Sequence, residues 1–363
     1  MGHFFQFHFL TVYPPSNPNR DEIGRPKSAV YGNAPRLRIS SQSIKRAVRC
    51  SEIFRHSLED HLGIRSRMLG DLIKDHLIKN KAVPEKEATD IATKIAEIFG
   101  KLDDKTNKSK GTVRIKQLAF ISPDEKQAAL DMADSLHSGE LKNNAKDLEK
   151  ELKCKILRSA DGAVDLAMFG RMLADTPDFN REAAVQVSHA ITTHKAVAED
   201  DFFIAADDLK DKSEDMGAGF AGDAAFGSGV YYLYACIDTD LLKENLKGDE
   251  KLACKAVQAL AEALATSSPS GKKNSFAHQT FAGYIRAEYG NQQPRSLAGA
   301  FFVPVRGEDL MGSSIAALEK TADHIRKAYG DNFEDEPVCL NVAEGQGSMK
   351  EILAFIEERM SHG

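Results

Sequence analysis

The segment at residues 36–49 combines side chains and backbone groups that suit contact with a sugar-phosphate chain. Residues 36–39 alternate basic and apolar side chains, which predicts a short strand with one charged face. From Ser40 onward the apolar spacing changes to that of a helix. A helix begins with unpaired backbone N–H groups and a partial positive charge, so it accepts a phosphate readily. The segment therefore predicts contact with the phosphates of a polyanion.

The predicted helix carries basic residues on one side and apolar residues on another. Lys45 and Arg49 share a face at i,i+4 spacing, so both can contact neighbouring phosphates. Ser40 and Ser41 can cap the N-terminus, and with Gln42 they add side-chain donors at that end. An apolar stripe at helical spacing predicts a face that packs on a core. The stripe consists of Ile44, Ala47, Val48, Ser51 and Phe54.

Basic residues from the preceding loop and strand extend this surface. They are Arg20, Lys27, Arg36 and Arg38. The same pattern also describes a capped amphipathic helix with an ordinary basic outer face. From the residues alone both interpretations stay open.

The distribution of charge along the chain favours binding to a polyanion, although the net charge is negative. The chain has a formal net charge of −6, but residues 20–55 hold nine Lys or Arg against three acids. That segment is therefore strongly basic and the remainder strongly acidic, with residues 199–215 the most acidic stretch. A local basic strip decides which polyanion can dock. A second basic stretch, residues 101–116, is better interpreted as a solvated surface.

Composition indicates a globular chain of 363 residues, with 42% hydrophobic and 28% charged residues. Its length suggests roughly two to three domains, or one domain with large insertions. No apolar run approaches the ~18 residues of a membrane span, and no signal peptide is recognisable. The five cysteines are scattered without a C-x-x-C pair, so neither disulfides nor a zinc knuckle is predicted. These features together predict a cytoplasmic location.

The hydrophobic pattern predicts an α+β fold. Residues 3–11 alternate as a strand, with Phe5, Phe7 and Phe9 on one face. Further strands are predicted at residues 185–193, 229–237 and 299–305, and helices at 249–265, 313–329 and 348–360. Residues 65–158 are mostly helical and are interpreted as an insertion or subdomain. A strand–helix–strand core with long insertions suggests a ferredoxin-like or RRM-like sheet.

Several ordered motifs resemble the CasC family, the backbone subunit of the type I-E Cascade complex within the RAMP superfamily of CRISPR proteins. The motifs are Asn19-Arg20-Asp21, Tyr31-Gly32, the run at residues 36–49, Gly170-Arg171-Met172, residues 189–194 and residues 202–209. The resemblance covers residues 1 to about 240 and is looser beyond 245, where residues 271–277 are the best anchor.

The resemblance implies a hand-shaped fold, with an RRM-like (ferredoxin-like) palm, a helical finger insertion and a protruding thumb. Residues 1–60 would form the first part of the palm with the basic RNA-grip helix, and residues 61–160 the finger insertion. Residues 161–225 would contain the thumb, and residues 226–363 would form the second part of the palm with the C-terminal helices.

The resemblance also implies a non-catalytic function in antiviral defence. Copies of such a subunit line up along one guide crRNA, hold its backbone and present it for pairing with target DNA. The expected partners are therefore crRNA, target DNA through the guide, further copies of the chain and other Cascade subunits. No membrane, cofactor or metal is expected. The residues expected to bind RNA are Asn19, Arg20, Lys27, Arg38, Ser40, Ser41, Gln42, Lys45, Arg46, Arg49, Lys272 and Lys273.

The thumb of this family displaces a guide base at regular intervals, which implies four base-displacing residues here. They are Arg171, Met172, Phe202 and Phe203. Acidic residues surround the phenylalanine pair, so it needs either a burial partner or a base to stack on. A place in the core is the competing interpretation. The aromatic signature of an RRM is absent, so base stacking on the sheet is not expected.

Other chemistries have weaker support. Asp21 lies where some relatives carry a catalytic aspartate, so a metal-dependent endoribonuclease is the alternative function, although a salt-bridge or loop-capping role suits its Asn-Arg-Asp-Glu context better. His189 and His194 have the wrong spacing for a zinc pair. The glycine-rich residues 217–229 lack a phosphate-binding Lys and suggest a flexible loop. A third hypothesis is a structural protein whose basic strip binds an acidic protein.

Overall fold

A computed structural model describes residues 2–141, 154, 156, 162–172, 180–205, 220–330 and 336–362. The chain divides into two compact units. Unit 1 comprises residues 1–55, 186–237 and 257–363, and unit 2 comprises residues 56–185 and 238–256. None of the described helices combines the length and apolar character needed to cross a membrane.

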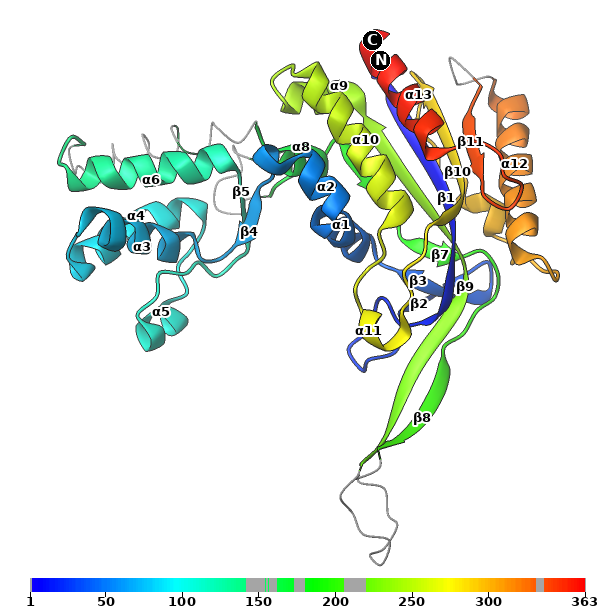
Figure 1. Ribbon diagram of the computed structural model, residues 1–363, viewed down its shortest axis with the longest axis horizontal. Coiled ribbons are helices and arrows are strands. Elements are labelled where there is room, and N and C mark those ends of the chain that lie inside the picture. Colours follow the sequence, from blue (N-terminus) through cyan, green and yellow to red (C-terminus); the bar gives the residue numbers. More distant parts are fainter. Residues whose placement is uncertain are drawn as a thin grey trace, which may run out of the picture. The chain divides into compact units, whose positions relative to one another are not determined.

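Unit 1 is built on one sheet, whose order in the described chain is β11-β10-β1-β9-β7-β3-β2, with β6 and β8 also paired to β9 (Figure 1). Its strands are β1 (Phe4–Ser16), β2 (Ser28–Tyr31), β3 (Ala34–Ile39), β6 (Val185–Val187), β7 (Ala190–Thr192), β8 (Glu199–Ala205), β9 (Phe220–Asp238), β10 (Ala282–Gly290) and β11 (Val338–Asn341). Its helices are α1 (Ser41–Cys50), α11 (Lys273–Phe276), the 3-10 turn η4 (Ala298–Phe301), α12 (Leu310–Tyr329) and α13 (Met349–His362). Helix α10 (Glu250–Thr266) runs from unit 2 into unit 1. The predicted α+β class is confirmed.

Helices cover both faces of this sheet. On one face Phe5, Phe7 and Phe9 are buried as predicted, and the Phe5 ring meets Phe355 of α13 edge-on at 5.9 Å. On the other face Leu318 of α12 joins an apolar cluster with strand residues such as Tyr232. Alternation along β1 therefore supplies one core on each side of the sheet.

Several strand predictions need correction. Residues 299–305 are not a strand. The 3-10 turn η4 buries Phe301, and Phe302 directly after it is exposed. The carbonyls of Ala298 and Phe301 accept hydrogen bonds from the distant side chains of Tyr31 and Arg36. The strand predicted at 185–193 is two short strands, β6 and β7. Residues 220–229 of the glycine-rich stretch are not a loop but the first half of β9. Strand β10 was missed, because its charged residues conceal the apolar alternation.

A buried polar network joins side chains of the adjacent strands β1, β9 and β10. His8 is fully buried, with Nδ1 2.9 Å from the Tyr232 hydroxyl and Nε2 3.3 Å from the Glu288 carboxylate. Arg286 and Arg295 donate to the same carboxylate at 2.6 and 2.7 Å. Burial lowers the pKa of His8. Burial alone would raise the pKa of Glu288, but its hydrogen bonds and positive neighbours hold it well below its ordinary value.

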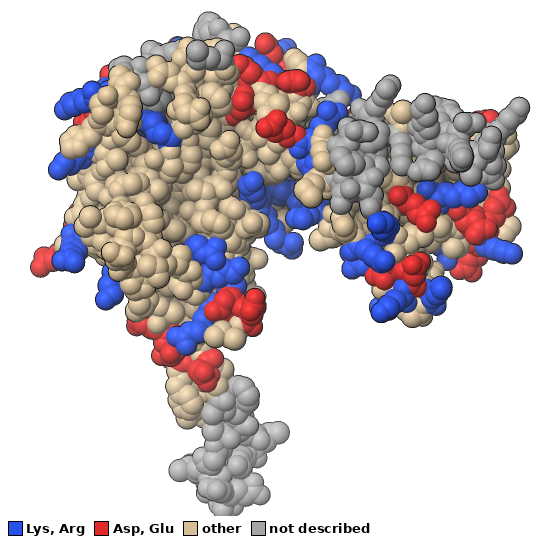
Figure 2. All heavy atoms as spheres, turned by 180° about the vertical axis from the view of Figure 1, so that it is seen from behind, with Lys and Arg blue, Asp and Glu red and all other residues tan. Residues whose placement is uncertain are grey.

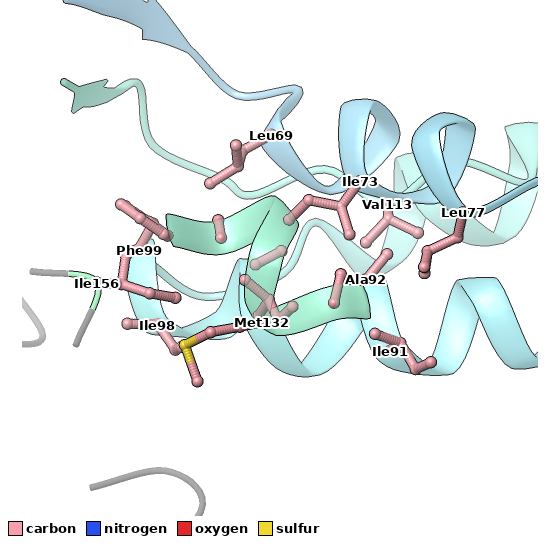
Figure 3. Packing of buried hydrophobic residues seen from close by; sticks show 14 of the residues in the cluster. Leu69, Ile73, Leu77, Ile91, Ala92, Ile98, Phe99, Val113, Met132 and Ile156 are labelled. Carbon is pink, nitrogen blue, oxygen red and sulfur yellow. The ribbon is translucent and has the colours of Figure 1, made fainter. Parts of the chain in front are cut away.

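Unit 2 is mainly helical. Its described elements are α2 (Glu52–Ser57, which begins in unit 1), η1 (Glu59–His61), β4 (Ile64–Ser66), α3 (Leu69–Lys81), α4 (Glu85–Phe99), α5 (Asp104–Lys110), β5 (Ala119–Ile121), α6 (Pro123–His137), α8 (Val164–Phe169) and α9 (Thr239–Asn245). Figure 3 shows Leu69, Ile73 and Leu77 of α3 facing Ile91 and Met132 of the neighbouring helices in one apolar core. The helical character predicted for residues 65–158 is present wherever α3 to α6 are described.

Candidate nucleic-acid interface

Helix α1 has the predicted apolar face. Ile44 and Val48 of α1 are buried, and so is Phe54, which lies in α2. The two helices are separated at Ser51, whose hydroxyl donates to the Val48 carbonyl at 2.7 Å and accepts the Phe54 N–H at 3.2 Å. Packing of this stripe leaves the residues on the other side of α1, such as Gln42 and Arg46, exposed to solvent.

The N-terminus of α1 is capped differently from the prediction. Ser40 occupies the N-cap position, but its side chain makes no capping hydrogen bond. Instead, Asn19 Oδ1 accepts the Ser40 N–H at 2.8 Å, and His189 Nδ1 accepts the Ser41 N–H at 3.2 Å. Acceptors from two distant segments replace the expected serine caps. In the first turn the Gln42 N–H has no acceptor among the described residues, so it is the backbone group available to a phosphate.

Four of the predicted basic residues lie on or beside α1. Arg46 is exposed, whereas Lys45 and Arg49 are partly buried and contact other groups. Burial lowers the pKa of Lys45. On β3, Arg38 places Nη1 3.1 Å from His189 Nδ1.

The loop at residues 17–27 adds cations and is fixed at several points. Asp21 Oδ1 accepts the N–H groups of Ile23 and Arg25 at 3.0 and 2.8 Å, a loop-capping geometry. Arg25 forms an ion pair with Asp200 at 3.0 Å. Arg20 and Lys27 form no ion pair within the described chain.

Asn17 anchors this loop, a role that the sequence pattern did not predict. Its amide nitrogen donates to the carbonyls of Gly24 at 2.9 Å and of Ala225 at 2.8 Å. The first bond closes the loop on itself, and the second joins it to β9. An Asn flanked by Ser16 and Pro18 is a turn signal, but its distant partner has no local signature.

Arg36 is not part of the surface, contrary to the prediction. Its side chain is completely buried and donates to the carbonyls of Tyr31 at 3.3 Å, Thr192 at 3.1 Å and Phe301 at 2.7 Å. Burial lowers the pKa of this guanidinium. The alternating pattern around Arg36 predicted a side chain that faces solvent. Three backbone carbonyls from separate segments instead accept the hydrogen bonds that water would otherwise accept.

Lys272 and Lys273 are exposed at the start of α11, and their loop lies against the loop at residues 17–27. A Cβ on Gly271 would clash with the carbonyl oxygen of Pro18. Figure 2 shows basic and acidic side chains meeting where the β8–β9 hairpin leaves the body of unit 1. The structure thus brings together the predicted residues of the early loop, of α1 and of residues 272–273.

The hairpin of β8 and β9 carries exposed apolar side chains. Phe202 is 66% exposed and Phe203 43% exposed, so neither belongs to the core. Phe202 is paired across the hairpin with Asp223, and Glu199, Asp200 and Asp201 precede it on β8. Residues 206–209 of the sequence motif lie outside the described residues.

Arg171 and Met172 belong to unit 2 and differ from each other. Met172 is 81% exposed. Arg171 is only 6% exposed, and its Nη1 lies 2.7 and 2.8 Å from the two carboxylate oxygens of Glu125. Glu125 also accepts the Ser122 N–H at the start of α6. We therefore assign Arg171 to the packing of unit 2, which corrects its expected contact with a displaced base.

The two histidines singled out by the sequence serve as hydrogen-bond acceptors. His194 Nε2 accepts the Val230 N–H at 3.3 Å, and Nδ1 lies 3.0 Å from the Lys195 carbonyl, which assigns the ring proton to Nδ1. His189 uses Nδ1 as the acceptor. Within the described ranges no three His, Cys, Asp or Glu residues gather as a metal site.

The fold and this surface define an α+β protein with a basic region built from the loop at residues 17–27, the N-terminus of α1 and the loop that carries Lys272 and Lys273. A family model described as CT1975-like protein, a Cas family, matches residues 5–359, and the chain belongs to this family. A chain solved in a "CRISPR RNA-guided surveillance complex, pre-nicking" is 27% identical, with a TM-score of 0.82 and 99% coverage of both chains. A chain from another "CRISPR RNA-guided surveillance complex" has 24% identity, a TM-score of 0.59 and the same coverage, and shows a similar fold. No curated protein matches the sequence.

We predict that Arg36→Met lowers the free energy of unfolding by about 3 kcal/mol or more, because each buried acceptor left without a donor costs about 1–3 kcal/mol. Urea denaturation followed by circular dichroism measures this change. Arg46→Met, the same replacement at an exposed site, should change stability by less than about 0.5 kcal/mol. Equal effects of the two substitutions would contradict a structural role for Arg36.

Proposed function

We propose that this chain is a non-catalytic subunit of a CRISPR RNA-guided surveillance complex, which holds the guide RNA by its backbone and presents it for pairing with target DNA. The observation that carries the proposal is the likeness, over 99% of both chains, to a chain of such a complex. The basic surface of unit 1 supports it independently. Sequence specificity then belongs to guide–target pairing, and the protein supplies contacts to phosphates.

The chemistry of the surface fits an RNA backbone better than an acidic protein. Arg20 and Lys27 extend from the loop at residues 17–27 and Arg46 from α1, and none has a carboxylate partner among the described residues. The backbone N–H of Gln42, which lies between Lys27 and Arg46 in sequence, adds a neutral hydrogen-bond donor. Spaced cations with backbone donors match a chain of regularly spaced phosphates.

We further propose the hand-shaped arrangement of the CasC family. The sheet of unit 1 would be its RRM-like palm, the helices of unit 2 its finger region and the β8–β9 hairpin its thumb. Several copies would line up along one guide, together with other subunits of a Cascade complex. The exposure of Phe202, Phe203 and Met172 supports their proposed contact with a displaced base, since apolar side chains in water gain from stacking.

Removal of two cations from α1 should weaken RNA binding without regard to sequence. We expect Lys45→Ala with Arg49→Ala to lower the affinity for single-stranded RNA. The slope of log K against log salt should become shallower by about 1.4, the contribution of two phosphates. Fluorescence anisotropy across a salt series measures both quantities.

Lys251→Ala with Lys255→Ala is the matched control. These exposed lysines have the same i,i+4 spacing on α10, and their removal changes the net charge equally. If the control lowers affinity and slope as much as the α1 pair does, α1 does not form a specific interface.

Purified chain should not cut RNA or DNA in the presence of Mg²⁺. Asp21 Oδ1 accepts the backbone N–H groups of Ile23 and Arg25 within its own loop, so this carboxylate has a structural role. Gel analysis of labelled RNA and DNA with and without Mg²⁺ tests this expectation. Metal-dependent cleavage that Asp21→Asn abolishes would favour the endoribonuclease instead.

Truncation of the exposed hairpin aromatic should loosen an assembled complex. Stacking on a base contributes about 1–3 kcal/mol, so Phe203→Ala should speed dissociation of the complex while single-subunit RNA affinity changes little. Met172→Ala should act similarly. Native mass spectrometry of reconstituted complexes follows the dissociation.

Phe281→Ala serves as the control, because this phenylalanine is 69% exposed on unit 1 but away from the hairpin sequence. A large fall in monomer stability for Phe203→Ala, with normal assembly per folded molecule, would assign Phe203 to packing.

A further inference from the structure

His189 lies between β6 and β7, and one of its ring nitrogens meets two donors. Nδ1 is 3.2 Å from the Ser41 backbone nitrogen and 3.1 Å from Arg38 Nη1. An amide N–H and a guanidinium N–H can only donate. Nδ1 must therefore offer its lone pair, which leaves the ring proton of the neutral imidazole on Nε2.

These two donors belong to different parts of the basic surface. Ser41 is the first residue of α1, and Arg38 is the penultimate residue of β3. A guanidinium is planar, so one bond to His189 fixes the direction of its remaining N–H groups. In the described part of the chain Arg38 makes no other side-chain hydrogen bond or ion pair, so those groups remain available to a ligand.

We propose that His189 is a positioning residue that holds Arg38 and the first turn of α1 in the geometry that binds a phosphate of the guide RNA, and that only its neutral form does so. The inference deepens the proposed function and rests on it. His189 acts through Arg38 and the α1 N-terminus, and its own contact with RNA is not required.

The surroundings of His189 oppose its protonation. Arg38 approaches from β3, Lys27 from the segment before β2, and the partly positive N-terminus of α1 from the third side. Burial and then the charges of Arg38 and Lys27 lower the pKa of His189 below its ordinary value. A proton on Nδ1 would also point an N–H at two donors, so both hydrogen bonds would break.

The direction of the pH dependence follows. In the unfolded chain this imidazole takes a proton near pH 6.5, whereas in the folded chain it does so only at lower pH. The unfolded state thus binds more protons between those values, and stability falls as the pH falls through that window. Near neutral pH the imidazole is neutral and the geometry is intact.

Two substitutions separate positioning from other roles. Asn at position 189 places an amide oxygen near the position of Nδ1 and does not titrate, whereas Ala removes the acceptor. At about pH 7.5 we expect His189→Asn to bind single-stranded RNA nearly as well as the natural chain. His189→Ala should bind about tenfold more weakly, the scale of one or two hydrogen bonds.

The same anisotropy measurements, repeated in steps from about pH 7.5 down to the lowest pH at which the chain stays folded, complete the test. Because the pKa of His189 is lowered, the natural chain should lose affinity only as the pH falls below about 6.5, and His189→Asn should not lose it, with affinities referred to the folded fraction from unfolding curves. His61→Asn, a substitution at an exposed histidine in η1, should leave affinity and pH profile as they are in the natural chain.

The outcomes distinguish the inference from the proposed function. If the natural chain binds no RNA at any pH, the proposed function fails. If Lys45→Ala with Arg49→Ala weakens binding but His189→Ala does not, only the inference fails. Tighter binding at low pH would make His189 a charged phosphate ligand, and a loss of stability without loss of affinity would make it purely structural. Either result overturns the positioning role.

Discussion

The position of the basic surface depends on Arg36, a buried cation that is not itself part of that surface. Arg36 is completely buried, has no carboxylate partner among the described residues, and is held by three backbone carbonyls. A buried charge is costly unless it is well hydrogen-bonded, so the carbonyls of Tyr31, Thr192 and Phe301 must converge on it. They come from the last residue of β2, from β7 and from η4. Because β3 carries Arg38 and leads directly into α1, this convergence fixes the base from which the surface residues extend.

The segment that carries the Phe301 carbonyl is held by the buried network around Glu288. Arg295 binds that carboxylate, and two residues later the Leu297 N–H donates to the Tyr232 hydroxyl at 2.9 Å. The short chain from Arg295 to Phe301 is therefore fixed to β9 and β10 before it meets Arg36. Two sets of buried polar groups, each satisfied by precise partners, thus connect the central strands to the edge of the sheet where α1 begins.

The local patterns in the sequence were sufficient for α1 and β1 but not for their surroundings. The stripe of Ile44, Val48 and Phe54 and the alternation of β1 are periodic, and periodicity is a property of neighbouring residues. Arg36 was misplaced because two of its three acceptors lie 156 and 265 residues away in sequence. Strand β10 was missed for a related reason, since Arg286 and Glu288 neutralise each other inside the core. The caps of α1 came from Asn19 and His189, not from the adjacent serines, because tertiary contacts supply better-placed acceptors than local ones.

The pairing of β1 with β10 sets the order in which the molecule can be completed. Phe4 lies opposite Gly290, so the edge of β1 that pairs with β10 stays open until the chain has been synthesised to that residue. At about 5–20 residues per second this interval is roughly 15–60 s. During it β1 can pair with β9 on one side only, and an aromatic strand with an open edge is a site for aggregation or for chaperone binding. Helical unit 2 has a core made largely of nearby residues and can collapse earlier, so synthesis favours a folded insertion inside an unfinished sheet.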